Sequence, residues 1–134
     1  MLATYLAGLP MFAAYLAIAV AALLAFTKVY TAITPHDEGA LISNGNNAAA
    51  VSYLGAKLGL ALPIASAAAN SVSIVDFVLW TAIACVVQIV TFFSYRMFYP
   101  TISASIEKGD MAPALRLAGT SVLVGLLNAA CMTY

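Results

Sequence analysis

Lys57 is a charged residue near the centre of an apolar run over residues 48–68. A charge at bilayer depth costs about 3 kcal/mol or more unless its head group reaches water or a polar partner. Gly55 and Gly59 lie on the opposite helical face, at a four-residue spacing that lets another helix backbone approach closely. Pro63 has no N–H to donate to the Gly59 carbonyl, which loses its usual helical partner. The stretch therefore predicts an intramembrane cation within about one turn of a free carbonyl.

Two interpretations of Lys57 stay open. Lys57 either faces a polar cavity or a neighbouring subunit, where it attracts anions, or it is a static element whose head group snorkels or pairs with a carbonyl. Tyr53 and Ile64 share its helical face. Asp76 presents a similar choice, between capping the third apolar run and reaching toward Lys57 as its counter-ion.

Two side-chain amides lie inside the third and fourth apolar runs. Gln88 is near the middle of the third run, where its amide predicts a hydrogen bond to another helix. Asn128 shares a small and polar face of the fourth run with Gly125. If the small-residue faces pack within one subunit, Lys57, Gln88 and Asn128 need partners from elsewhere. The polar stripe that contains Gln88 also includes Thr81, Ala84, Thr91 and Tyr95, at spacings of three and four.

The sequence predicts no catalytic centre, because it lacks a Ser/His, Cys/His or metal-ligand set at matching depth. Cys85 and Cys131 fall at different depths, so we expect no disulfide. The sole histidine, His36, lies beside Asp37 and Glu38 in a polar loop, which we interpret as solvated, with a ligand or proton-relay cluster as the alternative. We expect no enzyme activity, no metal and no cofactor.

The composition requires a membrane. Of the 134 residues, 64% are hydrophobic and 7% are charged, whereas soluble domains carry about 25% charged residues. Four apolar runs are long enough to span, at about residues 10–30, 48–68, 77–97 and 113–132, and lipid forces them to be helices. We therefore predict an all-α, polytopic membrane protein with a single transmembrane domain over residues 1–134.

The first run lacks a basic segment before it, so we expect it to be a retained span. Alanines recur every four residues along one of its faces. This spacing suits close helix packing, although alanine is also simply common in the run. These alanines are Ala13, Ala17, Ala21 and Ala25.

The second half of the sequence resembles the first at an offset of 64 residues. This offset predicts two tandem helical hairpins in the same orientation, that is, a parallel internal repeat. Residues 42–45 align with residues 106–109, and Ala48, Ala50, Gly55, Leu62 and Ala65 align with Ala112, Ala114, Gly119, Leu126 and Ala129.

Charge predicts the orientation in the membrane. Lys28, Arg96, Lys108 and Arg116 all fall on the side of the two long loops, and the other side has no Lys or Arg. The positive-inside rule then places the long loops in the cytoplasm and both termini outside. Asn46 or Asn47 is suited to cap the second spanning helix.

Several motifs in order resemble the YjfL-like family of small bacterial inner-membrane proteins, known as domain of unknown function 350. The resemblance covers residues 12–134 and implies four helices, no established activity, and an association with membrane-stress and envelope-maintenance proteins. It marks Glu38, Asn46, Asn47, Asp76, Gln88, Glu107 and Asn128 as positions to test. The motifs are Thr34-Pro35-His36-Asp37-Glu38, Asn46-Asn47-Ala48-Ala49-Ala50, Ser71-Val72-Ser73 with Asp76, Trp80, Gln88, Ile106-Glu107-Lys108-Gly109, and Gly125-Leu126-Leu127-Asn128-Ala129-Ala130.

Two functions fit these observations. The first is a homo-oligomer in the lipid bilayer whose subunits enclose a polar path for an ion or small solute, with Lys57 and Gln88 along it. The alternative is a non-conducting anchor or sensor in envelope maintenance, which docks a peripheral protein through loop residues such as Glu38 and Glu107. A net charge of zero gives no reason to expect a nucleic-acid partner.

Overall fold

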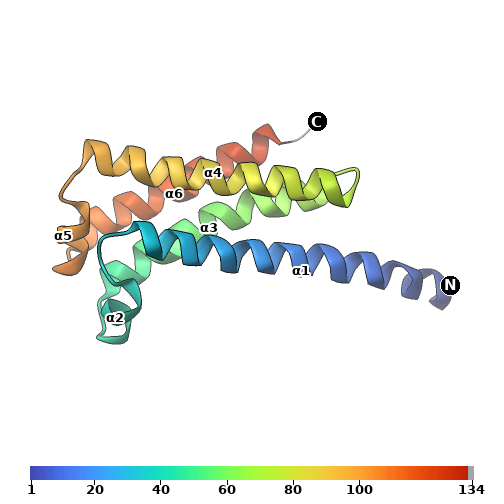
Figure 1. The fold of residues 1–134 in the computed structure, drawn as a ribbon, viewed down its shortest axis with the longest axis horizontal. Coiled ribbons are helices and arrows are strands. Elements are labelled where there is room, and N and C mark those ends of the chain that lie inside the picture. Colours follow the sequence, from blue (N-terminus) through green and yellow to red (C-terminus); the bar gives the residue numbers. More distant parts are fainter. Residues whose placement is uncertain (133–134) are drawn as a thin grey trace.

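The computed structural model describes residues 1–132, and its secondary structure over this range is entirely helical. Four long helices and two short ones follow one another along the chain (Figure 1). This arrangement confirms the predicted all-α fold. The helices are α1 (Leu2–Ile33), α2 (Glu38–Ser43), α3 (Asn47–Asn70), α4 (Ile74–Phe98), α5 (Ile102–Glu107) and α6 (Met111–Cys131).

The four long helices are each long and apolar enough to cross a membrane. They have 32, 24, 25 and 21 residues, and about 20 suffice for the hydrocarbon core. Helix α1 begins eight residues before its predicted start, so that Pro10 lies inside the helix. A proline removes one helical hydrogen bond, whereas leaving the flanking residues irregular would expose all their backbone groups to lipid.

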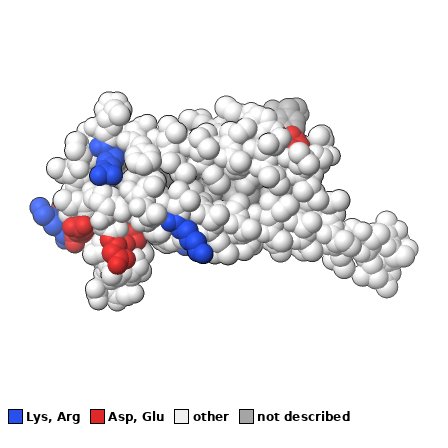
Figure 2. Space-filling model, in the orientation of Figure 1, with Lys and Arg blue, Asp and Glu red and all other residues white. Residues whose placement is uncertain are grey.

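Helices α3 and α6 form the centre of the bundle, and α4 packs against both. Helix α1 contacts α3 and α4 on one side, and its N-terminal part extends past the ends of the other helices (Figure 1). Helices α2 and α5 lie at one end of the bundle, and the start of α1 and the end of α6 lie toward the other end, with the α3–α4 connection (Figure 1). Charged side chains gather at the α2 and α5 end on the face drawn in Figure 2.

The two turns that precede α3 and α6 have the same local structure, 64 residues apart. Each short helix has six residues and is followed by a glycine of positive φ, 85° at Gly45 and 81° at Gly109. Glycine adopts this conformation without steric cost. In both turns the residue after the glycine donates its N–H to a carbonyl five residues earlier, from Asn46 to Leu41 and from Asp110 to Ser105. The likeness covers these turns, and a repeat relating the complete halves stays a prediction.

Candidate functional site

The tightest contact in the bundle joins the backbones of α3 and α6. A Cβ built on Gly55 would lie 2.5 Å from the Cα of Ala118, and one built on Gly125 would overlap the Gly59 carbonyl. Pro63, four residues after Gly59 and buried, is the residue that leaves this carbonyl without a helical donor. The free Gly59 carbonyl of α3 therefore lies directly against Gly125 of α6, and only glycine, which has no Cβ, leaves room for it.

Gln88 brings α4 into the same contact. Its side chain is buried, and its Nε2 donates a hydrogen bond of 3.0 Å to the Ser121 carbonyl of α6. A Cβ on Gly59 would lie 2.8 Å from Nε2, so the glycine also makes room for this amide. The predicted hydrogen bond from Gln88 to another helix is therefore confirmed, and the expectation that Gln88 needs a partner from elsewhere is wrong, because its amide is bonded within the chain.

Lys57 points away from the glycine contact, toward the α2 end of the bundle. It is half-buried, and its Nζ lies 4.3 Å from the centre of the Tyr53 ring, one helical turn nearer that end. The ring face attracts the cation, and the bent-back side chain lifts the charge out of the bilayer centre.

Asp76 lies past the opposite end of α3, so the structure does not bring it together with Lys57. Its carboxylate accepts a hydrogen bond from the Val72 N–H at 3.0 Å. Its own backbone N–H donates a hydrogen bond to the Ser73 hydroxyl oxygen at 3.1 Å. These bonds fit the capping role that the sequence allowed for Asp76.

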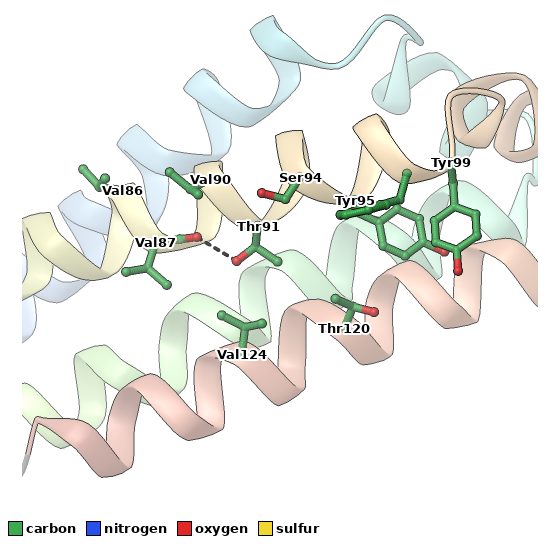
Figure 3. A pocket seen from close by; sticks show the side chains of 10 residues that line it. Val86, Val87, Val90, Thr91, Ser94, Tyr95, Tyr99, Thr120 and Val124 are labelled. Atoms are coloured by element: carbon green, nitrogen blue, oxygen red, sulfur yellow. Dashed lines mark hydrogen bonds between the residues drawn. The ribbon is translucent and has the colours of Figure 1, made fainter.

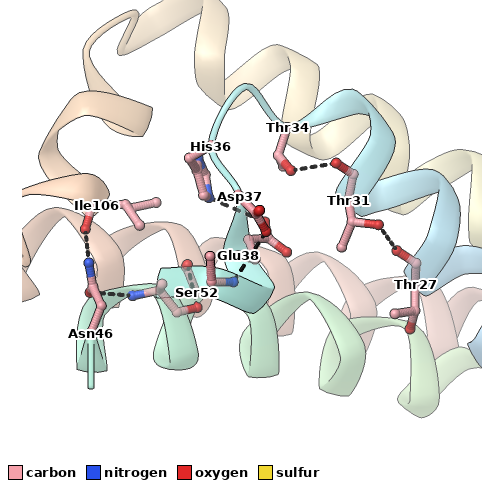
Figure 4. A network of polar contacts seen from close by, with 11 residues as sticks. Thr27, Thr31, Thr34, His36, Asp37, Glu38, Asn46, Ser52 and Ile106 are labelled. Atoms are coloured by element: carbon pink, nitrogen blue, oxygen red, sulfur yellow. Dashed lines mark hydrogen bonds and ion pairs between the residues drawn. The ribbon is translucent and has the colours of Figure 1, made fainter. Parts of the chain in front are cut away.

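The loop between α1 and α2 holds a buried histidine–glutamate pair. His36 Nε2 lies 3.2 Å from Glu38 Oε1, and the two residues are 4% and 2% exposed (Figure 4). Asp37, between them, is exposed and accepts the Ala40 N–H at 3.2 Å, which caps α2. The interpretation of this loop as solvated is therefore wrong for His36 and Glu38. Glu38 is also withdrawn from any surface that could dock a partner.

The His36–Glu38 pair retains unused bonding capacity. Among residues 1–132, none of its four side-chain nitrogen and oxygen atoms has a hydrogen-bond partner, so Nε2 and Oε1 lie close together without a hydrogen bond, and all four atoms are buried. Unpartnered buried polar atoms are rare and costly, so each one calls for an explanation. No third His, Cys, Asp or Glu in this range joins the pair in a set that could hold a metal ion.

A row of ionisable side chains leads from this pair into the membrane. Glu38 is close enough to act electrostatically on the hydroxyl of Tyr30, which is itself buried on α1. The Tyr30 ring lies 6.2 Å from that of Tyr53, which carries the Lys57 cation on its face. We call these five residues the ionisable row: His36, Glu38, Tyr30, Tyr53 and Lys57.

Most contacts of the ionisable row could not be predicted from the sequence alone. The pairing of Tyr53 with Lys57 follows from their four-residue spacing on one helix. Tyr30 is 23 positions before Tyr53 on a different helix, so no spacing rule connects them. The spacing of His36 and Glu38 on either side of an α2-capping Asp37 was the one local indication that both could turn inward.

The remaining polar positions divide between the two ends of the bundle. Asn46 caps α3 by accepting the Ala49 N–H at 3.0 Å, and it donates to the Ile106 carbonyl at 2.7 Å (Figure 4). Asn47 and Glu107 are exposed at the same end. Asn46 thus fastens the two turns together, and the exposed pair is free to meet solvent or a partner.

Asn128 lies toward the opposite end, where its buried Nδ2 has no hydrogen-bond partner among residues 1–132. The buried Thr81 hydroxyl on α4 likewise has no hydrogen-bond partner in this range. Thr81 precedes Gln88 by seven residues and Asn128 follows Ser121 by seven, so the two groups lie at similar depth, about 10 Å from the Gln88 bond.

Comparison with known proteins identifies the family. A family model described as Domain of Unknown Function (DUF350) matches residues 4–132. The chain is 40% identical over 123 residues to the UPF0719 inner membrane protein YjfL of Escherichia coli (strain K12), covering 92% of this chain and 93% of that protein. The same values hold for the protein of that name in Escherichia coli O157:H7. No solved structure gives a significant match. The resemblance seen in the sequence is thus confirmed, and the chain belongs to the DUF350 family of multi-pass inner membrane proteins.

Proposed function

We propose that this inner membrane protein is a homo-oligomer that carries a small ion along a polar path, and that the path begins at the ionisable row. The observation that supports the proposal is the row itself, which links the buried His36–Glu38 pair to Lys57. Histidine and carboxylate groups exchange protons readily, so the proton is the ion that this row is best equipped to carry. A polar path fits the general rule that ionisable residues within membrane segments mark ion routes.

The row extends through only part of one subunit. Lys57 is ten residues into α3, about 15 Å from its start, and its cation is bent back toward Tyr53. Beyond this depth the α3–α4–α6 contact is closed by backbone packing and by the Gln88 bond. The rest of the path would therefore form between copies of the chain, which is why the proposal includes self-association.

Ion flux into proteoliposomes tests this function. An imposed potassium diffusion potential should drive proton entry, read by an internal pH dye, in vesicles that contain the wild-type protein. Glu38→Gln and Lys57→Met should each reduce this flux by tenfold or more. Asp37→Asn is the matched control, because it changes a neighbouring exposed carboxylate and keeps the α2 cap. Wild-type flux no greater than that of empty vesicles would contradict the proposal.

A second function is favoured by the exposed α2 and α5 end. A polar hollow of about 300 Å³ lies there, lined by residues that include Asn44, Asn46, Glu107 and Lys108. A non-conducting anchor or sensor would dock a peripheral protein on this surface, without help from Glu38. Photo-crosslinking from position 107 should then capture a soluble protein, and crosslinking from position 76 at the opposite end should not. Recovery of self-crosslinks alone would count against docking.

We also propose that the α2 and α5 end faces the cytoplasm and that the protein catalyses no covalent reaction. Lys28, Arg96, Lys108 and Arg116 support the orientation, because they belong to this side of the helices. Both termini would then lie in the periplasm. A reporter fused to the C-terminus should be active only outside the cytoplasm, and activity confined to the cytoplasm would reverse the orientation.

A further inference from the structure

A groove of about 500 Å³ runs along the outer surface between α4 and α6 (Figure 3). Its walls include Val87, Val90 and Val124. The hydroxyls of Thr91 and Thr120 also face this region, but each donates to a carbonyl of its own helix, at 2.7 and 2.8 Å. With their donors used in this way, the groove presents an almost wholly apolar wall of a size that suits a hydrocarbon chain.

A smaller hollow that includes polar side chains lies next to this groove, toward the α5 end. The hollow measures about 170 Å³ and shares Tyr95 and Tyr99 with the larger groove, so the two are adjacent. Arg116 and Ser105 line it. Figure 3 places the two tyrosine rings at one end of the apolar groove.

Arg116 supplies this hollow with a positive charge that nothing in the described chain neutralises. Its guanidinium carbon lies 5.0 Å from the centre of the Tyr99 ring. Across residues 1–132 no carboxylate forms an ion pair with it. Arg116 is five residues into α6, about 8 Å from the start of the helix, which places it at the level of lipid head groups.

We propose that the groove and the adjacent hollow together form a binding site for an anionic phospholipid. One acyl chain would lie along the valine wall between α4 and α6, and the phosphate would bind Arg116, held in place by the Tyr99 ring. A guanidinium recognises phosphate through two parallel hydrogen bonds, and basic pockets between membrane helices commonly hold anionic head groups. A zwitterionic lipid such as phosphatidylcholine also carries a phosphate, but its own ammonium group balances that charge, so the unpaired charge of Arg116 should favour an anionic head group. The site is separate from the ionisable row and does not depend on ion transport.

Native mass spectrometry from mixed nanodiscs tests the site. The discs contain equal amounts of phosphatidylglycerol and phosphatidylcholine with identical acyl chains, and the lipid retained on the released protein is measured. The wild type should retain phosphatidylglycerol in preference. Arg116→Gln should weaken this retention about tenfold, the effect of losing a charge-assisted bond. Lys108→Gln is the matched control, because it removes the same charge from an exposed residue outside the groove, and it should retain lipid normally.

A second variant tests the apolar part of the site. Val90→Trp fills the groove and leaves Arg116 in place, and Val90 is exposed, so the bundle should fold as judged by circular dichroism. This variant should also lose the retained phosphatidylglycerol. Equal retention of the two lipids by the wild type would overturn the proposal. Equal losses in Arg116→Gln and Lys108→Gln would do the same, because they would show a general charge effect.

Discussion

Helix α3 meets two of its long neighbours, α6 and α1, in opposite ways. Against α6, the contact is backbone to backbone, through Gly59 and Gly125. Helix α1 is held by aromatic side chains, and only Phe26 and Tyr30 of its residues are buried. Its ring contact with α3 is Tyr30 with Tyr53 at 6.2 Å, and its ring contacts with α4 are Tyr15 with Phe77 at 4.9 Å and Tyr30 with Phe92 at 5.2 Å.

Helices α1 and α3 both carry small residues at a four-residue spacing, yet only those of α3 pack against another helix of the chain. The α3 glycines face small residues of α6, so the two backbones can approach from both sides. The α1 stripe of Ala13, Ala17, Ala21 and Ala25 is exposed, because α1 packs through the opposite face. Small residues therefore permit close approach but do not determine which face packs. Helix α1, which carries Tyr30 and leads into the loop of the His36–Glu38 pair, therefore buries fewer residues than α3 does.

The largest effect should come from one methyl group in the α3–α6 contact. Gly125→Ala places a Cβ on the Gly59 carbonyl, so the helices must separate, at a cost of about 1–3 kcal/mol typical of overpacking. The measurement is the temperature at which the detergent-solubilised protein loses its monodisperse peak.

Gly119→Ala is the control for this change, because it lies on the same helix and its added Cβ meets no atom within 4 Å. It should leave stability unchanged or raise it by up to about 1 kcal/mol, since alanine favours a helix over glycine. Equal melting of the two variants would show that Gly125 is not in close contact.

The sequence predicted the spans and the small-residue contact because those features are local. Length and hydropathy determine a span, and the four-residue spacing of Gly55 and Gly59 is enough to predict the face on which helices pack closely. A hydrogen bond from the Gln88 amide to another helix could be predicted. Its partner could not, because the acceptor is a backbone carbonyl, which every residue type has. Burial of His36 and Glu38 depends on how the loop folds back over the bundle, which their spacing around Asp37 allows but does not determine.

The Gln88 bond joins α4 to the α3–α6 pair, and its removal should have an intermediate effect. Gln88→Leu leaves the packing volume similar and loses one interhelical hydrogen bond, worth about 1 kcal/mol in a membrane. Thr91→Val is the control, because the Thr91 hydroxyl bonds only to its own helix. In the same heating assay, Gln88→Leu should lose its monodisperse peak at a lower temperature than the wild type. Thr91→Val should lose it at the wild-type temperature. A larger loss in Thr91→Val would contradict the role given to Gln88.

The smallest effect on stability should come from the exposed alanine face of α1. Ala17→Leu with Ala21→Leu adds bulk where the chain itself makes no close contact, so stability should change by less than about 0.5 kcal/mol. The same variant still tests self-association, because small residues are what allow helices of two copies to meet closely. Native mass spectrometry in lipid should show smaller complexes if copies meet through this face. A melting loss as large as that of Gly125→Ala would mean that α1 packs through its alanines, and the contrast between the two contacts of α3 would disappear.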